Sequence, residues 1–207
     1  MINRIIITMG DPAGIGAEIA VKFFDEFYKI EERGIVAVLC GSRSLIEKEI
    51  IRLKASLEIE EIEDESKIKN LVMKNGVLYL INIESEFEIE IGKVSKEAGL
   101  MSMKYLERAV RLVKNGTFDA VATCPISKDA INLAGYRYDG HTGYFAEKCR
   151  CDNYGMVLKG NKITVILNTT HVSMKKAVEE VKKESILKKI ILANEFVKTD
   201  TNNNISG

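Results

Sequence analysis

Short apolar runs alternate with segments of helical periodicity along the chain. The apolar runs are Arg4 to Thr8, Ile35 to Cys40, Val77 to Ile83 and Phe118 to Cys124. Apolar residues recur at spacings of three and four in Ala17 to Tyr28, Leu45 to Leu53 and Leu100 to Val113. Continuous apolar strands are typical of sheets covered on both faces, and strands joined by amphipathic helices predict an α/β fold with a parallel sheet.

Local signals refine these elements. Ser42 is placed to cap the second helix, and Gly116 to end the third. The alternation of apolar and acidic residues from Glu86 to Ile91 predicts a half-exposed strand, and therefore a mixed sheet. The stretch Glu58 to Glu65 holds six acids in eight residues, which indicates a solvated helix edge or surface excursion rather than a cation site.

The last third of the chain predicts a hairpin and a helix. Met156 to Leu158 and Ile163 to Leu167 read as strands joined by a turn at 159–162, and Val178 to Val197 returns to helical spacing. The polar end, Thr199 to Gly207, reads as a loop. Because the chain has 207 residues, more than most single domains, we expect residues 1–207 to form one large lobe or two interleaved lobes.

Composition narrows the class of protein. With 46% hydrophobic residues the chain can bury a core without disulfides, and the formal net charge of +0 provides no global field for nucleic acid or an anionic membrane. No apolar run approaches the roughly 18 residues of a membrane span. The four cysteines are scattered, and Cys149 and Cys151 lack the two-residue gap of common zinc sites. We therefore expect a cytoplasmic protein with reduced thiols and neither a nucleic-acid nor a membrane partner.

The glycine-rich turn at residues 9–16 lies between a predicted strand and a predicted helix. Its backbone N–H groups and the positive helix end favour an anion there. The spacing Gly-x3-Gly-x-Gly matches neither the dinucleotide fingerprint nor a Walker A loop, so the turn alone is explained as well by plain chain reversal. Asp11 is a candidate for binding substrate, or equally a turn acceptor for local amides.

A second loop follows the strand that ends at Cys124. Ser127 is placed to cap a helix through Asp129 to Ala134, so that Lys128 projects from its first turn. A lysine in this position can pair with a phosphate or carboxylate, or donate a proton when desolvated. The alternative is an ordinary solvated lysine.

The chain has two histidines, which we place in loops between a strand and a helix. His141 precedes Thr142, a candidate helix cap, and His171 follows the apolar run that ends at Leu167. A single histidine is more often structural, but two at equivalent sheet ends favour function. Two histidines remain an incomplete divalent-metal site, which needs three or more protein ligands.

Four ordered motifs resemble one known family. They are ITMGDPAGIGAEIA at 7–20, TCPISKDAINLAG at 123–135, GHT at 140–142 and TTH at 169–171. Together they are similar to the 4-hydroxythreonine-4-phosphate dehydrogenase (PdxA) family, over nearly the whole chain.

The resemblance implies an isocitrate/isopropylmalate-dehydrogenase-like fold with three α/β/α layers, and a homodimer with its active sites at the subunit interface. It implies NAD- or NADP-linked oxidation of a phosphorylated hydroxy acid with a divalent metal (Zn, Mg, Mn or Co). In the family pattern His141 and Thr142 bind substrate, and His171 is a metal ligand. We add Lys128 as a proton relay or substrate-holding group, and no cofactor-binding residue is identified.

This chain departs from the family pattern in two places. Family chains continue past the position of Gly207 and supply two further metal-binding histidines there, so the resemblance predicts a C-terminally incomplete chain. Gly143 stands where the family usually has glutamate.

The resemblance predicts oxidation, with decarboxylation, of 4-phosphooxy-L-threonine in pyridoxal phosphate biosynthesis. One alternative is a dehydrogenase of 4-phospho-D-threonate or 4-phospho-D-erythronate in sugar-acid catabolism. Another, from a different class, is a non-catalytic fragment that acts as an assembly domain. A phosphate-loop kinase is disfavoured because no lysine follows Gly16.

Overall fold

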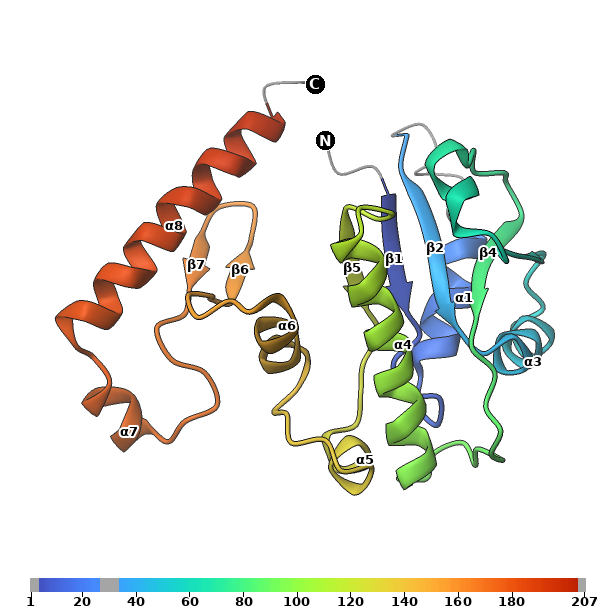
Figure 1. Ribbon diagram of the computed structural model, residues 1–207, viewed down its shortest axis with the longest axis horizontal. Coiled ribbons are helices and arrows are strands. Elements are labelled where there is room, and N and C mark those ends of the chain that lie inside the picture. The colour runs from blue at the N-terminus through green and yellow to red at the C-terminus, as the bar shows by residue number, and fades with distance from the viewer. Residues whose placement is uncertain (1–3, 27–33, 205–207) are drawn as a thin grey trace. The chain divides into compact units, whose positions relative to one another are not determined.

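The computed structural model describes residues 4–26 and 34–204, which divide into two compact units (Figure 1). The N-terminal unit is Ile2–Gly140 and the C-terminal unit is His141–Gly207. The first contains β1 (Arg4–Thr8), α1 (Gly16–Asp25), β2 (Val36–Gly41), α3 (Arg43–Leu53), β3 (Glu58–Glu61), the 3₁₀ helix η1 (Glu65–Asn70), β4 (Val77–Asn82), α4 (Lys96–Lys114), β5 (Ala120–Thr123) and α5 (Lys128–Leu133). The second contains α6 (His141–Cys149), β6 (Val157–Lys159), β7 (Thr164–Ile166), α7 (Met174–Glu179) and α8 (Lys183–Asn204). None of the helices described is both long and apolar enough to cross a membrane.

The N-terminal unit is built on a five-stranded sheet of order β3-β4-β2-β1-β5, and every pair in it is parallel. β1 lies between β2 and β5, so that Thr8 is in register with both Cys40 and Thr123. The carboxyl ends of these three strands therefore meet at one edge of the sheet. The predicted parallel α/β fold is confirmed.

Helices cover both faces of this sheet. α4 lies on one face, in front of the sheet in Figure 1, where it contacts β1, β2 and β5, and α1 lies behind the sheet. Fully buried side chains such as Val38, Leu80 and Tyr105 fill the space between the layers. β1 leads into α1 on one face, whereas β5 leads into α5, which packs on α4. Such a divergence between neighbouring strands marks the switch point where open α/β sheets bind ligands.

The long helix α4 follows from its sequence. The Ser95 side chain accepts a hydrogen bond from the Ala98 N–H at 3.1 Å and caps the first turn. Members of the apolar stripe, including Met103 and Leu106, are buried. Gly116 has φ 78° and ends the helix in the left-handed conformation that glycine favours. The helix is confirmed, with a start four residues before Leu100.

Two related predictions for the first unit were wrong. The strand expected over Glu86 to Ile91 is a loop, and the sheet is entirely parallel and not mixed. The Ser85 hydroxyl accepts a hydrogen bond from the Phe87 N–H at 3.0 Å, a local bond that competes with strand pairing.

The acidic stretch Glu58 to Glu65, expected to be a solvated helix edge or surface excursion, contains the edge strand β3. In this strand half-buried Ile59 lies between exposed Glu58 and Glu60. Charged side chains on an edge strand discourage pairing with other chains.

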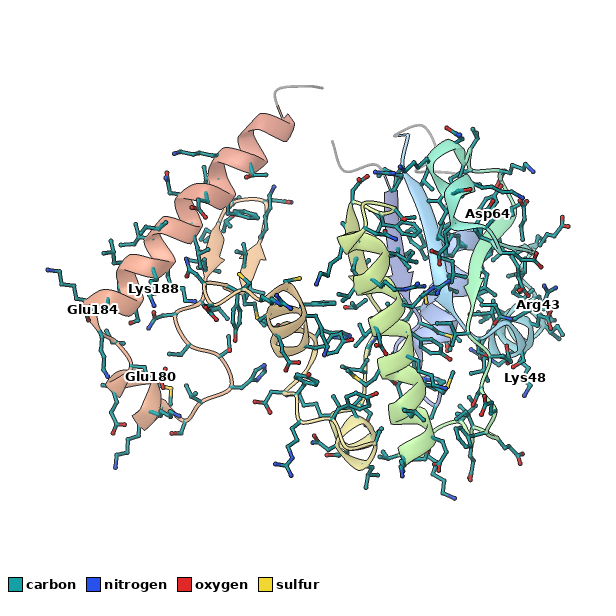
Figure 2. All side chains as sticks on the ribbon, viewed as in Figure 1. Arg43, Lys48, Asp64, Glu180, Glu184 and Lys188 are labelled. Carbon is teal, nitrogen blue, oxygen red and sulfur yellow. The ribbon has the colours of Figure 1, made fainter. Side chains whose placement is uncertain are left out.

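The C-terminal unit confirms the predicted hairpin, since β6 and β7 pair antiparallel. The single helix expected over Val178 to Val197 is wrong. It is divided into α7 and α8 at Glu180, whose carbonyl accepts a hydrogen bond from the Ser185 hydroxyl at 2.9 Å (Figure 2). The loop expected over Thr199 to Gly207 is also wrong as far as Asn204, because α8 continues to that residue.

Parts of two predictions lie outside the described residues. They are Phe27 and Tyr28 in the helix expected over Ala17 to Tyr28, and residues 205–207 at the end of the chain.

Candidate active site

Two loops meet at the carboxyl ends of β1 and β5. The Asp11 N–H donates a hydrogen bond to the Pro125 carbonyl at 2.9 Å. Gly10 has φ 76°, and a Cβ at this position would lie 2.2 Å from the same carbonyl oxygen. Only glycine combines this backbone conformation with so close an approach. The glycine-rich turn therefore packs closely against the loop that leads to Lys128.

The structure shows Asp11 in its role as a turn acceptor. Its Oδ1 accepts a hydrogen bond from the Ala13 N–H at 2.9 Å, and the residue is buried. Burial raises the pKa of Asp11 against the smaller lowering by the Ala13 N–H. The Ala13 carbonyl in turn accepts a hydrogen bond from Gly92 at 2.7 Å, which fastens the loop after β4 to the turn. Asp11 thus organises the backbone beside the switch point.

Lys128 is the first residue of α5, as predicted. The Ser127 side chain caps this helix by accepting a hydrogen bond from the Ala130 N–H at 3.2 Å. The Lys128 side chain is exposed. It extends past Gly140, where a Cβ would lie 4.0 Å from the lysine Cε. An exposed ammonium at a helix start in the switch-point loop can meet an anionic ligand.

His141 is the first residue of α6 and is half-buried. Its ring stacks on Phe145, with centroids 6.1 Å apart and an angle of 23° between the planes. Within the described part of the chain its buried Nε2 has no hydrogen-bond partner. Burial lowers the pKa of His141, which favours the neutral imidazole at neutral pH. A buried ring nitrogen with no partner is free to bond a polar ligand atom.

Two sequence predictions about this motif were wrong. Thr142 lies inside the first turn of α6 instead of capping it, because the helix already begins at His141. His141 does not follow a strand, since α6 comes after α5, so the two histidines do not occupy equivalent sheet ends.

His171 lies in the segment between β7 and α7, as predicted, and its side chain is exposed. It has φ 56°, a left-handed conformation that is uncommon outside glycine, asparagine and aspartate. Two residues later, Ser173 caps α7 through the Lys176 N–H at 3.3 Å. The strain and exposure of His171 are compatible with a functional side chain.

The predicted residues are divided between the units. Asp11 and Lys128 belong to the N-terminal unit, whereas His141, Thr142 and His171 belong to the C-terminal unit. Across residues 4–26 and 34–204, no three His, Cys, Asp or Glu side chains are grouped so that they could hold a metal ion. The described residues alone therefore do not fit a complete metal site, which needs at least three protein ligands.

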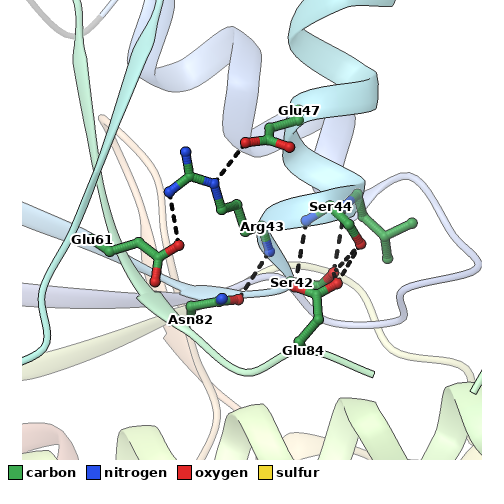
Figure 3. A network of polar contacts seen from close by, with 8 residues as sticks. Ser42, Arg43, Ser44, Glu47, Glu61, Asn82 and Glu84 are labelled. Atoms are coloured by element: carbon green, nitrogen blue, oxygen red, sulfur yellow. Dashed lines mark hydrogen bonds and ion pairs between the residues drawn. The ribbon is translucent and has the colours of Figure 1, made fainter. Parts of the chain in front are cut away.

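A polar network that the sequence analysis missed occupies the carboxyl ends of β2 and β4 (Figure 3). Glu84 accepts hydrogen bonds from the hydroxyls of Ser42, at 2.7 Å, and Ser44. Partial burial acts to raise the pKa of Glu84, but the bonds from Ser44 and Ser42 outweigh it and hold the pKa below its ordinary value. The carboxylate also approaches the Ser44 N–H at 3.4 Å. A protein carboxylate thus already fills the anion-favouring start of α3.

Replacing Ser42 by alanine should destabilise the N-terminal unit by about 1–2 kcal/mol, the usual effect of losing a helix cap. The change removes the acceptor for the Leu45 N–H and a donor to Glu84. Urea unfolding followed by far-ultraviolet circular dichroism measures the effect. Ser44→Ala is the matched control, because it removes a donor to the same carboxylate but leaves the cap. An equal loss in both variants would contradict the capping role.

An apolar groove of about 440 Å³ also lies on the N-terminal unit, along α1 and the edge strand β5. Its lining residues are Ile5, Ile7, Ile19, Ala20, Phe23, Ile35, Ala37, Ala122, Thr123 and Cys124. Burial raises the pKa of the Cys124 thiol to about 11, so this cysteine is protonated at neutral pH. None of these described lining residues is charged, and the groove is not the candidate active site.

Comparison with known proteins gives consistent matches over most of the chain. The family model described as pyridoxal phosphate biosynthetic protein PdxA matches residues 34–205. The 4-hydroxythreonine-4-phosphate dehydrogenase of Sulfurihydrogenibium sp. (strain YO3AOP1) is 40% identical over 191 residues, which are 92% of this chain and 56% of that protein. The D-threonate 4-phosphate dehydrogenase of Salmonella typhimurium is 31% identical, over 95% of this chain and 59% of that protein.

Solved structures agree with these matches. A crystal structure of 4-hydroxythreonine-4-phosphate dehydrogenase from Klebsiella pneumoniae superposes with a TM-score of 0.83 at 29% sequence identity, covering 96% of this chain and 59% of that chain. The chain thus spans between half and two thirds of the length of these relatives. The likeness confirms the predicted isocitrate/isopropylmalate-dehydrogenase-like fold class.

Proposed function

The chain belongs to the PdxA family of pyridoxal phosphate biosynthetic proteins. We therefore propose that it acts as an NAD- or NADP-dependent dehydrogenase of a 4-phosphorylated hydroxy acid. The proposed substrate is 4-phosphooxy-L-threonine, which is oxidised and then decarboxylated. The family match over residues 34–205 carries this proposal, and relatives named as dehydrogenases support it.

His141 and Thr142 are the proposed substrate-binding pair. The buried Nε2 of His141 is without a partner among the described residues, and the Thr142 hydroxyl lies in the exposed first turn of the same helix. A neutral imidazole that donates from Nε2 can hydrogen-bond a phosphate or carboxylate oxygen, and a helix start favours negative charge. Phe145 stacks on the ring.

Lys128 is the proposed catalytic group of the N-terminal unit. Its position at the start of α5, beside the switch point, suits a side chain that neutralises the substrate or transfers a proton to it. The proposed contribution of Asp11 to substrate binding is indirect, through the turn that it holds in place, because its Oδ1 already accepts the Ala13 N–H. The backbone of that turn is the part that a ligand could approach.

His171 is the proposed metal ligand of this chain. The described residues offer no complete ligand set for such an ion. A divalent ion of this kind would polarise the hydroxyl that is oxidised, and NAD or NADP would accept the hydride.

A homodimer with active sites at the interface is also proposed. The C-terminal unit exposes many large apolar side chains, which is unusual for a surface that stays in water. On α8 these are Ile186, Leu187, Ile190, Ile191 and Val197. A second copy of the chain would bury this surface.

A second candidate is the oxidation of 4-phospho-D-threonate or 4-phospho-D-erythronate. It is favoured by the 31% identity to a relative named D-threonate 4-phosphate dehydrogenase. The two reactions are distinguished by the ratio of kcat/KM for the two phosphorylated acids, followed by the absorbance of the reduced nicotinamide.

Changing the two histidines separately tests the proposal. In the presence of a chelator, His141→Ala should weaken binding of the phosphorylated acid about 10- to 100-fold, the equivalent of a hydrogen bond to a charged group. His171→Ala should leave that binding unchanged and instead abolish metal-dependent turnover. Isothermal titration calorimetry measures the binding. Equal affinity in wild type and His141→Ala would refute the substrate assignment, and no reduction of NAD or NADP with either acid would favour a non-catalytic assembly domain.

A further inference from the structure

α6 ends in a turn that holds two cysteines. The helix ends at Cys149, and the Arg150 N–H donates to the Glu147 carbonyl at 3.0 Å. The Cys151 N–H donates to the Ala146 carbonyl at 2.9 Å, and Arg150 between the cysteines has φ 52°. This pair of bonds around a left-handed residue is the Schellman motif, which fixes the backbone on both sides of Arg150.

The two thiols of this turn differ from the other two in the chain. Cys149 and Cys151 are exposed, whereas Cys40 and Cys124 are buried. Burial raises the pKa of Cys40 to about 12 and that of Cys124 to about 11, which leaves almost no thiolate at neutral pH. Since the thiolate is the reactive form, thiol chemistry is confined to the exposed pair.

The backbone of the turn brings the two cysteines within disulfide range. Left-handed helical backbone has the same Cα spacing as its right-handed mirror image, so residues on either side of Arg150 have Cα atoms about 5.4 Å apart. Disulfide-bonded cysteines have Cα atoms about 4.4–6.8 Å apart. We propose that Cys149 and Cys151 form a reversible disulfide, by exchange with a low-molecular-weight disulfide such as oxidised glutathione.

The exchange takes place in two steps. The thiolate of one cysteine attacks a sulfur of the glutathione disulfide, forms a mixed disulfide and releases one glutathione thiolate. The thiolate of the second cysteine then attacks the protein sulfur of that mixed disulfide, closes the ring and releases the second glutathione. The two protein thiols lose two electrons and two protons, and one glutathione disulfide becomes two glutathione thiols.

The turn also indicates whether the two thiols or the disulfide are favoured at equilibrium. The disulfide ring would contain a single residue between its cysteines, and both cysteines are exposed. Exposed disulfides are among the easily reduced ones. The Cys151 thiol donates to the Asn153 carbonyl at 3.4 Å, which gives the reduced turn a bond that the disulfide loses. The pair is therefore reduced in a reducing solution and closes as the glutathione pool becomes oxidised.

Mass spectrometry of the whole chain after incubation with oxidised glutathione tests the proposal. After this treatment, two thiols of the parent protein should no longer react with an alkylating reagent. The protein should also carry no glutathione, because closure of the disulfide ring releases it. Cys149→Ser and Cys151→Ser should each stop at the mixed disulfide and retain one glutathione. Cys40 and Cys124 are the internal controls, which alkylate only after unfolding.

Three results would overturn the proposal. One is a parent chain that retains one or two glutathiones at equilibrium, and another is a disulfide-linked dimer on a non-reducing gel. The third is a parent chain whose Cys149 and Cys151 both alkylate as fast after treatment as before it. Circular dichroism of both serine variants verifies that the fold is retained.

Discussion

Gly99→Ala is expected to destabilise the N-terminal unit by about 3 kcal/mol or more, the range of severe overpacking of a core. A Cβ at position 99 would lie 1.9 Å from the Ala130 carbonyl oxygen and 2.3 Å from its carbon. Both atoms belong to the backbone of α5, so no side-chain rotation can relieve the overlap. The substitution forces α4 and α5 apart, or prevents α5 from docking.

The sign of this effect distinguishes helix propensity from packing. Glycine inside a helix costs about 1 kcal/mol relative to alanine, so propensity alone predicts that Gly99→Ala is stabilising. The structure predicts the reverse. Urea unfolding followed by circular dichroism gives the change in free energy, with Glu107→Ala on the exposed side of α4 as the control. A Gly99→Ala protein as stable as the control would show that α4 and α5 are not in close contact.

α5 carries Lys128, so the same contact has a functional consequence. Ser127 caps α5, and Ala130 in the first turn of this helix meets Gly99. The lysine is thus positioned by a local cap and by the contact of its helix with Gly99 of α4. The sequence predicts the first of these and gives no indication of the second.

Features set by nearby residues were predictable from the sequence. The caps at Ser42 and Ser127 and the end of α4 at Gly116 depend on residues within one helical turn. The buried parallel strands were equally predictable, because continuous apolar runs of strand length fit few other structures. The same local reading failed at Glu86 to Ile91, where the alternation is that of a strand but none of the described strands pairs with it.

The candidate site was only partly predictable. Lys128 lies in the first turn of α5 and His171 lies in a loop, both as expected, whereas Thr142 is the second residue of α6 and does not cap it. The role of Glu84 was missed, since its partners Ser42 and Ser44 lie 42 and 40 residues earlier and meet it only when β2 and β4 pair. Contacts of this range depend on sheet order, which local periodicity does not encode.

The glycine-rich turn is the clearest case in which the structure changes an interpretation. The sequence left its purpose open between anion binding and chain reversal. In the structure its glycines permit close backbone approaches: a Cβ at Gly16 would lie 1.8 Å from the Met9 carbonyl oxygen and 3.2 Å from the Cys124 Cβ. Packing of the turn between β1 and the loop after β5 is therefore sufficient to require glycine at this position.

Gly16→Ala is accordingly expected to destabilise the protein by about 3 kcal/mol or more, because the overlap again involves backbone that cannot rotate away. Gly14→Ala is the matched control in the same turn. Its Cβ would lie 3.3 Å from the Asp11 carbonyl oxygen, and the residue is exposed, so we expect a loss below about 1 kcal/mol. Urea unfolding of the two variants in parallel measures the difference.

The same pair of variants separates packing from anion binding. If Gly16 is needed for packing, Gly16→Ala lowers the free energy of unfolding in buffer that contains no phosphorylated ligand. If the glycines serve only to cradle an anion, both variants unfold like the parent without ligand, and both lose the stabilisation that a phosphorylated acid confers. The 1.8 Å approach to Met9 predicts the first outcome, and two variants as stable as the parent would refute it.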